Sequence, residues 1–188
     1  MSSKIILILL TAAWAGVFSR HAGERALIAR GRELEKAKKY AEAVAFYAQA
    51  VQEKKLSPNT CRLFLNRCGY LENDTQKKID YYRRSCLVPG SDATENYRTY
   101  LWLGGCYRRF NPGKALGYYQ NMPDPKAIHP SLIYQGYMEI GKVYELQGKK
   151  TLALEAYTKA LAAGKSITYK YNYSAAEKAL ARLNNKEK

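Results

Sequence analysis

The chain has 188 residues and a formal net charge of +15, from 31 Lys and Arg against 16 Asp and Glu. Hydrophobic residues make up 47% of it, which excludes a disordered tail and suits one folded domain or a short repeat array. Its two histidines, His21 and His129, lie far apart, and the sequence contains no Cys-x-x-Cys pair and no glycine-rich phosphate loop. We therefore expect no metal, no cofactor and no enzymatic activity.

Residues 1–19 have the composition of a targeting segment. Lys4 precedes an uncharged stretch from Ile5 to Ser19, in which Ala13-Trp14-Ala15 has the small-x-small pattern that signal peptidase accepts. As a helix the stretch would cover about 22 Å, less than the roughly 30 Å of a hydrocarbon core, which favours a cleaved secretory signal.

Arginines follow at positions 20, 25, 30 and 32, and they favour an uncleaved anchor instead. Positive residues beside an apolar segment tend to stay on the cytoplasmic side of a membrane. The chain is therefore expected in the secretory pathway or cell envelope, where it would be secreted, periplasmic or held by the N-terminal segment. The alternative is an N-terminal anchor with the remainder of the chain facing the cytosol. A helix buried within the fold is a third interpretation of the same segment.

Two segments, 27–50 and 137–160, carry similar residue types at the same intervals. Small residues let two helices cross closely, and large residues three or four positions away fill the neighbouring space, so the pattern predicts two helical hairpins. The residues are Leu27, Gly31, Leu34, Ala43, Tyr47 and Ala50 in the first segment, and Tyr137, Gly141, Tyr144, Ala153, Tyr157 and Ala160 in the second.

Two further copies are predicted between these segments, with their small residues at positions 68 and 104. The four small-residue positions, 31, 68, 104 and 141, are then almost evenly spaced. The marker residues are Phe64, Cys68, Leu71, Ile79, Arg83 and Cys86 in the weaker second copy, and Tyr100, Leu103, Gly104, Tyr107, Ala115, Tyr119 and Met122 in the third.

This pattern resembles the tetratricopeptide repeat family. The resemblance implies an all-α fold, a right-handed α-α superhelix or solenoid of about four helical hairpins over 24–165. A shorter helix is predicted over 174–185, because Ser174 and Glu177 form a capping-box pattern before an apolar run that ends near Asn184. A solenoid needs such a polar terminal helix to cover its open hydrophobic edge.

Members of this family bind peptides or helices in a concave groove lined by the first helix of each hairpin, and the resemblance implies a groove here. Stepping around each first helix with helical period gives a basic face with an apolar floor. Such a groove suits an acidic or amphipathic protein segment, although the same cations also fit the solvated faces of a basic protein. The predicted groove residues are Arg25, Ile28, Arg32, Arg62, Leu65, Asn66, Arg98, Leu101, Arg108, Gln135, Met138 and Lys142.

Chaperone-binding members of the family hold a C-terminal carboxylate with Lys and Asn residues on their first helices. Asn66 and Arg98 fall at two such positions, but Ile28 and Arg32 replace the Lys and Asn that the first repeat would need. A carboxylate clamp of that type is therefore not expected. The resemblance implies a non-enzymatic scaffold or adaptor that binds a protein partner.

The net charge suggests a second class of function, the binding of nucleic acid or a polyanionic surface. Lys165-x-x-x-Tyr169-Lys170-Tyr171-x-Tyr173 combines rings with cations, as nucleic-acid interfaces do. Anionic lipid headgroups or a cell-wall polymer would suit the same charge. Because repeat positions account for most other tyrosines and an exported protein seldom meets nucleic acid, we keep this function as the alternative.

Cys61, Cys68, Cys86 and Cys106 lie within 46 residues, and an exported chain would pair them in two bridges. Cys61 and Cys68 lie about 10.5 Å apart within one helix, beyond the roughly 7 Å that a disulfide spans between Cα atoms. In an antiparallel hairpin that turns near residues 73 and 74, Cys61 faces Cys86, which leaves Cys68 to pair with Cys106. The alternative is four small buried residues in a reducing compartment.

Overall fold

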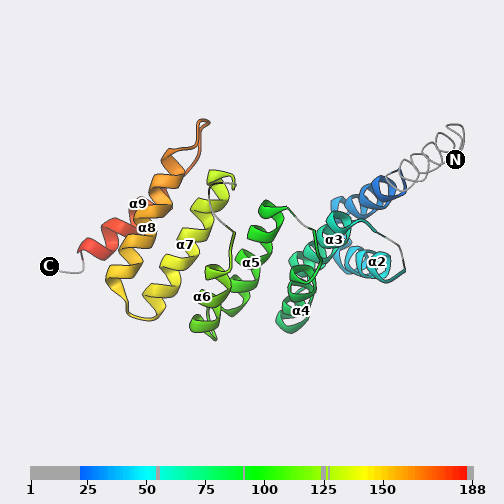
Figure 1. Cartoon of the computed structure of the whole chain (residues 1–188), viewed down its shortest axis with the longest axis horizontal. Helices are drawn as coiled ribbons and strands as arrows, with labels where there is room; N and C mark the ends of the chain where they lie inside the picture. Colours follow the sequence, from blue (N-terminus) through cyan, green and yellow to red (C-terminus); the bar gives the residue numbers. More distant parts are fainter. Residues whose placement is uncertain (1–21, 54–55, 91, 124–125, 127, 186–188) are drawn as a thin grey trace, which may run out of the picture.

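The computed structural model describes residues 22–53, 56–90, 92–123, 126 and 128–185, and all regular structure within these ranges is helical (Figure 1). The predicted all-α class is therefore confirmed. Residues 22–36 form the first helical segment. It is followed by α2 (Tyr40–Glu53), α3 (Pro58–Leu71), α4 (Thr75–Cys86), α5 (Ala93–Tyr107), α6 (Pro112–Gln120), α7 (Pro130–Leu146), α8 (Lys150–Lys165) and α9 (Ser174–Asn184).

The predicted targeting segment 1–19 and His21 lie outside the described residues. Among the helices that the structure describes, none combines the length and the apolar character needed to cross a membrane.

Short polar side chains set the helix starts at the breaks that the sequence marks. The Asp74, Asp92 and Asn111 side chains accept the backbone N–H groups of Lys77, Glu95 and Lys114 at 2.8–2.9 Å, which satisfies donors that a helix leaves unpaired. The helices α3, α6 and α7 each begin with proline, which has no N–H to satisfy.

The last helix follows the prediction in extent but not in its cap. It spans Ser174–Asn184, close to the predicted 174–185, yet Ser174 is its first helical residue and no side chain caps it from the preceding position. The side chain of Asn172 accepts the N–H of Ser174 at 3.0 Å instead. The predicted capping box is therefore wrong, because the helix begins one residue too early for Ser174 to act as its cap.

Each of the four helical hairpins contains a glycine on its first helix against a tyrosine ring on its second. A Cβ atom built on any of these glycines would clash with that ring. The glycine is therefore what lets the two helices approach, and the buried ring fills the space that it leaves. The pairs are Gly31 with Tyr47, Gly69 with Tyr82, Gly104 with Tyr119, and Gly141 with Tyr157.

The pair in the second hairpin moves each of the two predicted marker positions by one residue. Gly69 and Tyr82 occupy the positions assigned from sequence to Cys68 and Arg83, and the small residue one turn after the tyrosine is the fully buried Ser85 rather than Cys86. Cys68 is also fully buried, so a small residue was correctly expected inside the hairpin. Arg83 is exposed. This agrees with the high cost of burying an unpaired charged side chain.

Consecutive helices pack against one another along the whole described chain, so the hairpins follow in sequence order along the long axis (Figure 1). The helix 22–36 and helices α3, α5 and α7 are the first helices of the hairpins, and α5 also contacts α7 directly. The core consists of successive clusters rather than one centre: Phe64 belongs to the first, Leu103 to the second and Tyr134 to the last. Such stacking is typical of a repeat array.

All four cysteines are free thiols in the structure, so the predicted bridges, Cys61 with Cys86 and Cys68 with Cys106, are not formed in it. The contact of Gly69 with Tyr82 explains why Cys61 and Cys86 are not bridged. It shifts the register of α3 against α4 by about one helical turn from the register that would place Cys61 opposite Cys86.

Candidate functional site

The largest concentration of predicted groove residues lines a hollow between α5, α7 and α9. Its volume is about 360 Å³. Four of its lining residues, Leu101, Gln135, Met138 and Lys142, were predicted from sequence to line the groove. The others are Trp102, Gly105, Tyr134, Glu139 and Ala175.

Helical spacing brings these side chains to one place. Leu101 and Gly105 lie one turn apart on α5, and Met138 and Lys142 lie one turn apart on α7. Gly105 faces open space, because a Cβ atom on it would have no heavy atom within 4 Å. The floor is therefore apolar, with the polar side chains on the α7 side.

The polar side chains at the rim form a small ionic network. Glu139 accepts from Arg108 and, at 2.6 Å, from Lys142. Burial lowers the pKa of Lys142, and the nearby Arg108 guanidinium lowers it further. One carboxylate thus pairs with two of the predicted groove cations and offsets one of their two charges, so the rim is less basic than the sequence indicated.

The Tyr134 hydroxyl is buried at the hollow, and its O–H finds no acceptor among the described residues. Its neighbour, the N–H of Ala176, is engaged with the carbonyl of Tyr173 at 3.0 Å. Burial raises the pKa of Tyr134, so the hydroxyl keeps its proton. A buried O–H donor without an acceptor is costly, and a bound group that offers an oxygen would satisfy it.

A second hollow, of about 220 Å³, lies between the first helical segment, α2 and α3, and it contains the predicted residues Ile28 and Arg32. Glu35 closes one side. It accepts from the Tyr47 hydroxyl and from Nε of Arg67, both at 2.8 Å, and so connects the first hairpin to the second.

Three predicted groove residues are buried inside the array instead. Arg62, Leu65 and Asn66 are each at most 2% exposed. Arg62 donates to the Asn96 side chain and to the Val88 carbonyl. The correction for these three is that they are buried in the array rather than exposed to solvent. They are therefore not available to a partner.

Asn66 contacts the next first helix through its side chain, which donates to Oγ1 of Thr99 at 3.1 Å. Thr99 is itself fully buried and donates to the Glu95 carbonyl at 2.8 Å. These contacts join α3 to α5, so this position provides a polar bridge between hairpins and not a carboxylate clamp.

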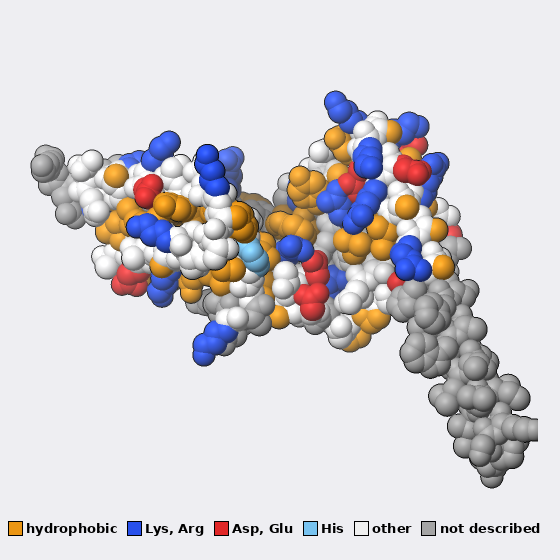
Figure 2. Space-filling view, turned by 90° about the horizontal axis from the view of Figure 1, so that it is seen from above, with side chains coloured by type: hydrophobic (Ala, Val, Ile, Leu, Met, Phe, Trp, Pro, Cys, Tyr) orange, Lys and Arg blue, Asp and Glu red, His pale blue; other side chains and the backbone are white. Residues whose placement is uncertain are grey.

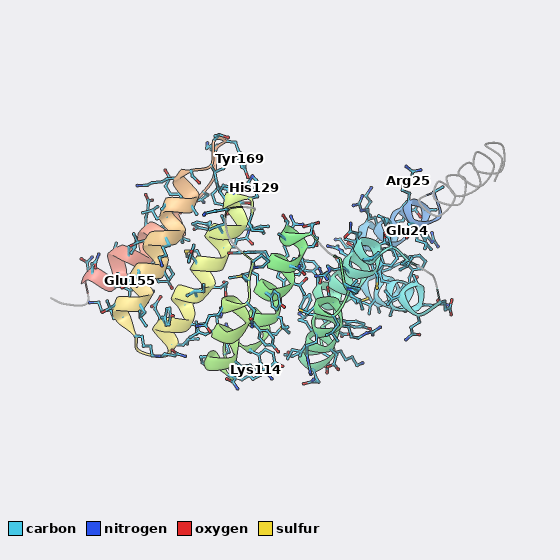
Figure 3. The ribbon with its side chains drawn as sticks, in the orientation of Figure 1. Glu24, Arg25, Lys114, His129, Glu155 and Tyr169 are labelled. Atoms are coloured by element: carbon cyan, nitrogen blue, oxygen red, sulfur yellow. The ribbon has the colours of Figure 1, made fainter. Side chains whose placement is uncertain are left out.

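The remaining predicted cations differ in their surroundings. Arg98 pairs with Glu95 on its own helix, and Arg108 pairs with Glu139 of the next first helix. Arg25 is exposed near the start of the described chain, beside the buried Glu24 (Figure 3). The structure therefore separates the predicted basic face into one apolar hollow, one small polar hollow and several ion pairs.

Sequence reasoning missed five lining residues of the main hollow: Trp102, Gly105, Tyr134, Glu139 and Ala175. Trp102 and Glu139 each follow a predicted residue by one position, so widening the predicted stripe would have found them. Ala175 carries no such signal, because α9 reaches the hollow only through its tertiary packing.

Among the residues that the structure describes, no three His, Cys, Asp or Glu side chains are grouped so that they would hold a metal ion. The apolar floor and polar rim of the hollow have the composition of a site for apolar and hydrogen-bonding contacts. No protein-family model matches the chain, and comparison with the curated proteins gives no match.

Proposed function

We propose that the chain is a non-enzymatic scaffold or adaptor of the tetratricopeptide repeat type, whose concave groove binds an acidic or amphipathic segment of a protein partner. The observation that carries the proposal is the hollow between α5, α7 and α9, with its apolar floor and polar rim. The recurring glycine–tyrosine contact supports the family and, with it, a right-handed superhelix.

The charges at the hollow favour an amphipathic segment over a purely acidic one. Because Glu139 already accepts from Arg108 and Lys142, an acidic side chain would have to compete with it for these cations. An apolar side chain gains from burial against Leu101 and Met138 without that competition. Trp102 at the floor offers the kind of aromatic contact that dominates many interfaces.

Blocking the hollow tests this function. Gly105→Leu places a large side chain at the lining of the hollow, at a position where a Cβ atom meets no heavy atom within 4 Å, and circular dichroism checks that the fold accepts it. Peptides are selected by display on the full chain, and the affinity of each selected peptide is measured with a fluorescent label. We expect an amphipathic peptide whose affinity falls at least about tenfold in Gly105→Leu, because its anchoring side chain loses its place.

Gly117→Leu is the matched control. Gly117 lies on α6, away from the hollow, and it also has no heavy atom within 4 Å of a built Cβ. Circular dichroism should be the same for both variants and the parent. Equal peptide binding by Gly105→Leu and Gly117→Leu would rule out the hollow, and failure to select any peptide would count against an adaptor.

The proposed location follows from residues 1–19, which we propose to be a secretory signal or an N-terminal membrane anchor. The two differ in one measurable property. The N-terminal sequence of the protein purified from its native membrane or secreted fraction begins after about residue 15 if a signal is cleaved at the small-x-small pattern, and before residue 5 if an anchor is retained.

One observation keeps polyanion binding as a second candidate function. The Tyr169 ring is 55% exposed and stacks on His129 with 6.1 Å between ring centroids, while Lys165 and Lys170 are exposed nearby in sequence. Figure 2 views the molecule from this edge and shows the pale-blue histidine at its surface. Binding of an oligonucleotide that is lost in Tyr169→Ala and falls steeply with salt would favour this candidate.

A further inference from the structure

A third hollow opens where α5 and α7 end, beside the α5–α6 and α7–α8 turns. It has a volume of about 410 Å³ and is lined by Arg108, Arg109, Lys142, Glu145 and Leu146. Both turns lie at the lower edge of the molecule in Figure 1, and Figure 3 labels Lys114 of α6 at that edge. We call this region the turn edge.

Cations outnumber acids at the turn edge, and the nearby acids are already engaged. Glu139 accepts from Arg108 and Lys142. Glu145 accepts from the Tyr157 hydroxyl at 2.5 Å and from Arg182 at 2.7 Å. Residues 108–114 contain two arginines and one lysine without an acid, and Lys149 and Lys150 follow at the second turn. The edge therefore presents a positive field to solvent.

Two large apolar side chains protrude between these cations. Phe110 is 60% exposed and Leu146 is 58% exposed. The centroids of the Phe110 and Tyr107 rings are 5.2 Å apart, and Nζ of Lys114 lies 4.3 Å from the centroid of the Tyr107 ring. Neither Phe110 nor Leu146 is needed for the core, and large apolar groups beside cations at an edge are typical of proteins that bind at a membrane interface.

We infer that the turn edge docks onto the surface of an anionic phospholipid bilayer. The exposed Arg109 and Lys149 face the phosphate groups of the lipids, and Phe110 and Leu146 enter the boundary between headgroups and acyl chains. The inference goes beyond the proposed function and does not depend on it, because Arg109, Phe110 and Leu146 do not line the hollow between α5, α7 and α9.

A lipid surface fits the turn edge better than other polyanions do. A nucleic acid would gain from stacking its bases on rings, and Leu146 offers none. An acidic peptide would match the cations but leave Phe110 and Leu146 in water. If the stretch from Ile5 to Ser19 is retained as an anchor, it also holds the chain at a membrane.

The test places a fluorescent probe at the edge of the full chain. The fluorescence of the new tryptophan in Phe110→Trp is obtained by subtracting the emission of the parent chain, which has its own tryptophans. Both chains are mixed with vesicles whose acyl chains carry bromine, because bromine quenches a tryptophan that enters the acyl region. With vesicles of phosphatidylcholine and phosphatidylglycerol we expect the added emission to be quenched. With phosphatidylcholine alone we expect it to stay unquenched, even where residues 5–19 hold the chain on the vesicle.

Charge reversal separates the turn edge from net charge. Arg109→Glu combined with Lys149→Glu, in the Phe110→Trp chain, should weaken docking at least about tenfold, because each cation near an anionic surface contributes roughly fivefold. Lys165→Glu combined with Lys170→Glu is the matched control. It changes the net charge equally, and its residues lie by the Tyr169 loop at the opposite edge (Figure 3). Docking should survive in this control.

Several results would overturn the inference. Quenching that is the same in both lipid mixtures would show apolar insertion without recognition of anionic lipid. Absence of quenching in both would exclude docking by this edge, and equal loss in the two reversal pairs would assign the effect to net charge. Free glycerol phosphate is also added to the chain without vesicles. If it shifts the added emission, and brominated vesicles cause no quenching, the hollow would be assigned to a soluble phosphate.

Discussion

Gly141 and Tyr157 are in such close contact that a Cβ atom on the glycine would lie 2.6 Å from Cε1 of the tyrosine ring. The ring is 1% exposed, and its hydroxyl donates to Glu145 at 2.5 Å, so it cannot move aside without losing that hydrogen bond and its packing. The last hairpin therefore depends on the absence of a side chain at position 141.

Gly141→Leu should destabilise the fold by about 1–3 kcal/mol or more, because an added side chain overpacks the helix crossing. Urea denaturation followed by circular dichroism measures the loss. Gly117→Leu, at a glycine with open space, and Lys149→Leu, at the exposed turn, should be nearly neutral. A Gly141→Leu chain as stable as these two controls would contradict the hairpin register.

The second hairpin offers a comparison of adjacent residues. Gly69→Ala should cost about 1–3 kcal/mol, because its Cβ would lie 2.6 Å from the Tyr82 ring. Cys68→Ala should cost less, about 1 kcal/mol, because it removes only a small buried group. Thermal unfolding of both variants decides the register. A larger loss for Cys68→Ala would restore the register expected from the even spacing of small residues.

Arg62 should behave as a structural residue rather than a binding residue. In Arg62→Met the Asn96 side chain and the Val88 carbonyl each lose a hydrogen bond from the buried guanidinium, and the loss of hydrogen bonds to a charged group costs about 1.5–3 kcal/mol. Stability should therefore fall, while the affinity of a selected peptide measured well below the melting temperature should stay the same. Lost peptide binding by a chain of unchanged stability would return Arg62 to the groove.

The first and fourth hairpins turn through the same left-handed backbone conformation, at Lys38 with φ of 58° and at Gly148 with φ of 70°. A side chain is strained in this region, so Lys38→Gly should stabilise the chain by about 0.5–1 kcal/mol. Gly148→Lys should cost a similar amount. Chemical denaturation of the two variants measures the change in the free energy of unfolding. We expect an increase for Lys38→Gly and a decrease for Gly148→Lys.

Alkaline pH should destabilise the fold through groups whose pKa burial has raised. Burial raises the pKa of Cys68 from 9.0 to about 12 and the pKa of Tyr119 from 10.0 to about 12. Above the ordinary pKa the unfolded chain releases these protons while the folded chain retains them, so the free energy of unfolding decreases as pH rises from about 9 to about 12. Below pH 9 this contribution is complete.

Denaturation curves at a series of alkaline pH values measure this decrease. The Cys68→Ala chain should show a smaller decrease from about pH 9 upward, because it lacks one of the four thiols whose pKa burial raises from 9.0. Phenolate absorbance provides an independent check, since buried tyrosines such as Tyr119 should ionise only with unfolding. A free energy of unfolding that stays constant up to pH 11 would contradict the burial of these groups.

Local patterns determined the helices and the crossing points of three hairpins. Gly31, Gly104 and Gly141 were found from spacing alone, because helical period places a glycine and its flanking large residues on one face whatever lies beyond. The second hairpin was displaced by one residue because Cys68 and Gly69 are both small. Only the Tyr82 ring, on another helix, distinguishes the two positions.

The candidate site was determined less completely by the sequence. Helical period places Arg62, Leu65 and Asn66 on the same stripe as other predicted groove residues, but the rotation of α3 between its neighbours turns that part of the stripe toward α5. Likewise, Glu139 cancels the charge of Arg108 only because α5 and α7 lie side by side. A chain by itself specifies which residues share a helix face. Which neighbour that face meets, and which charges remain unpaired there, is decided by the packing of several helices at once.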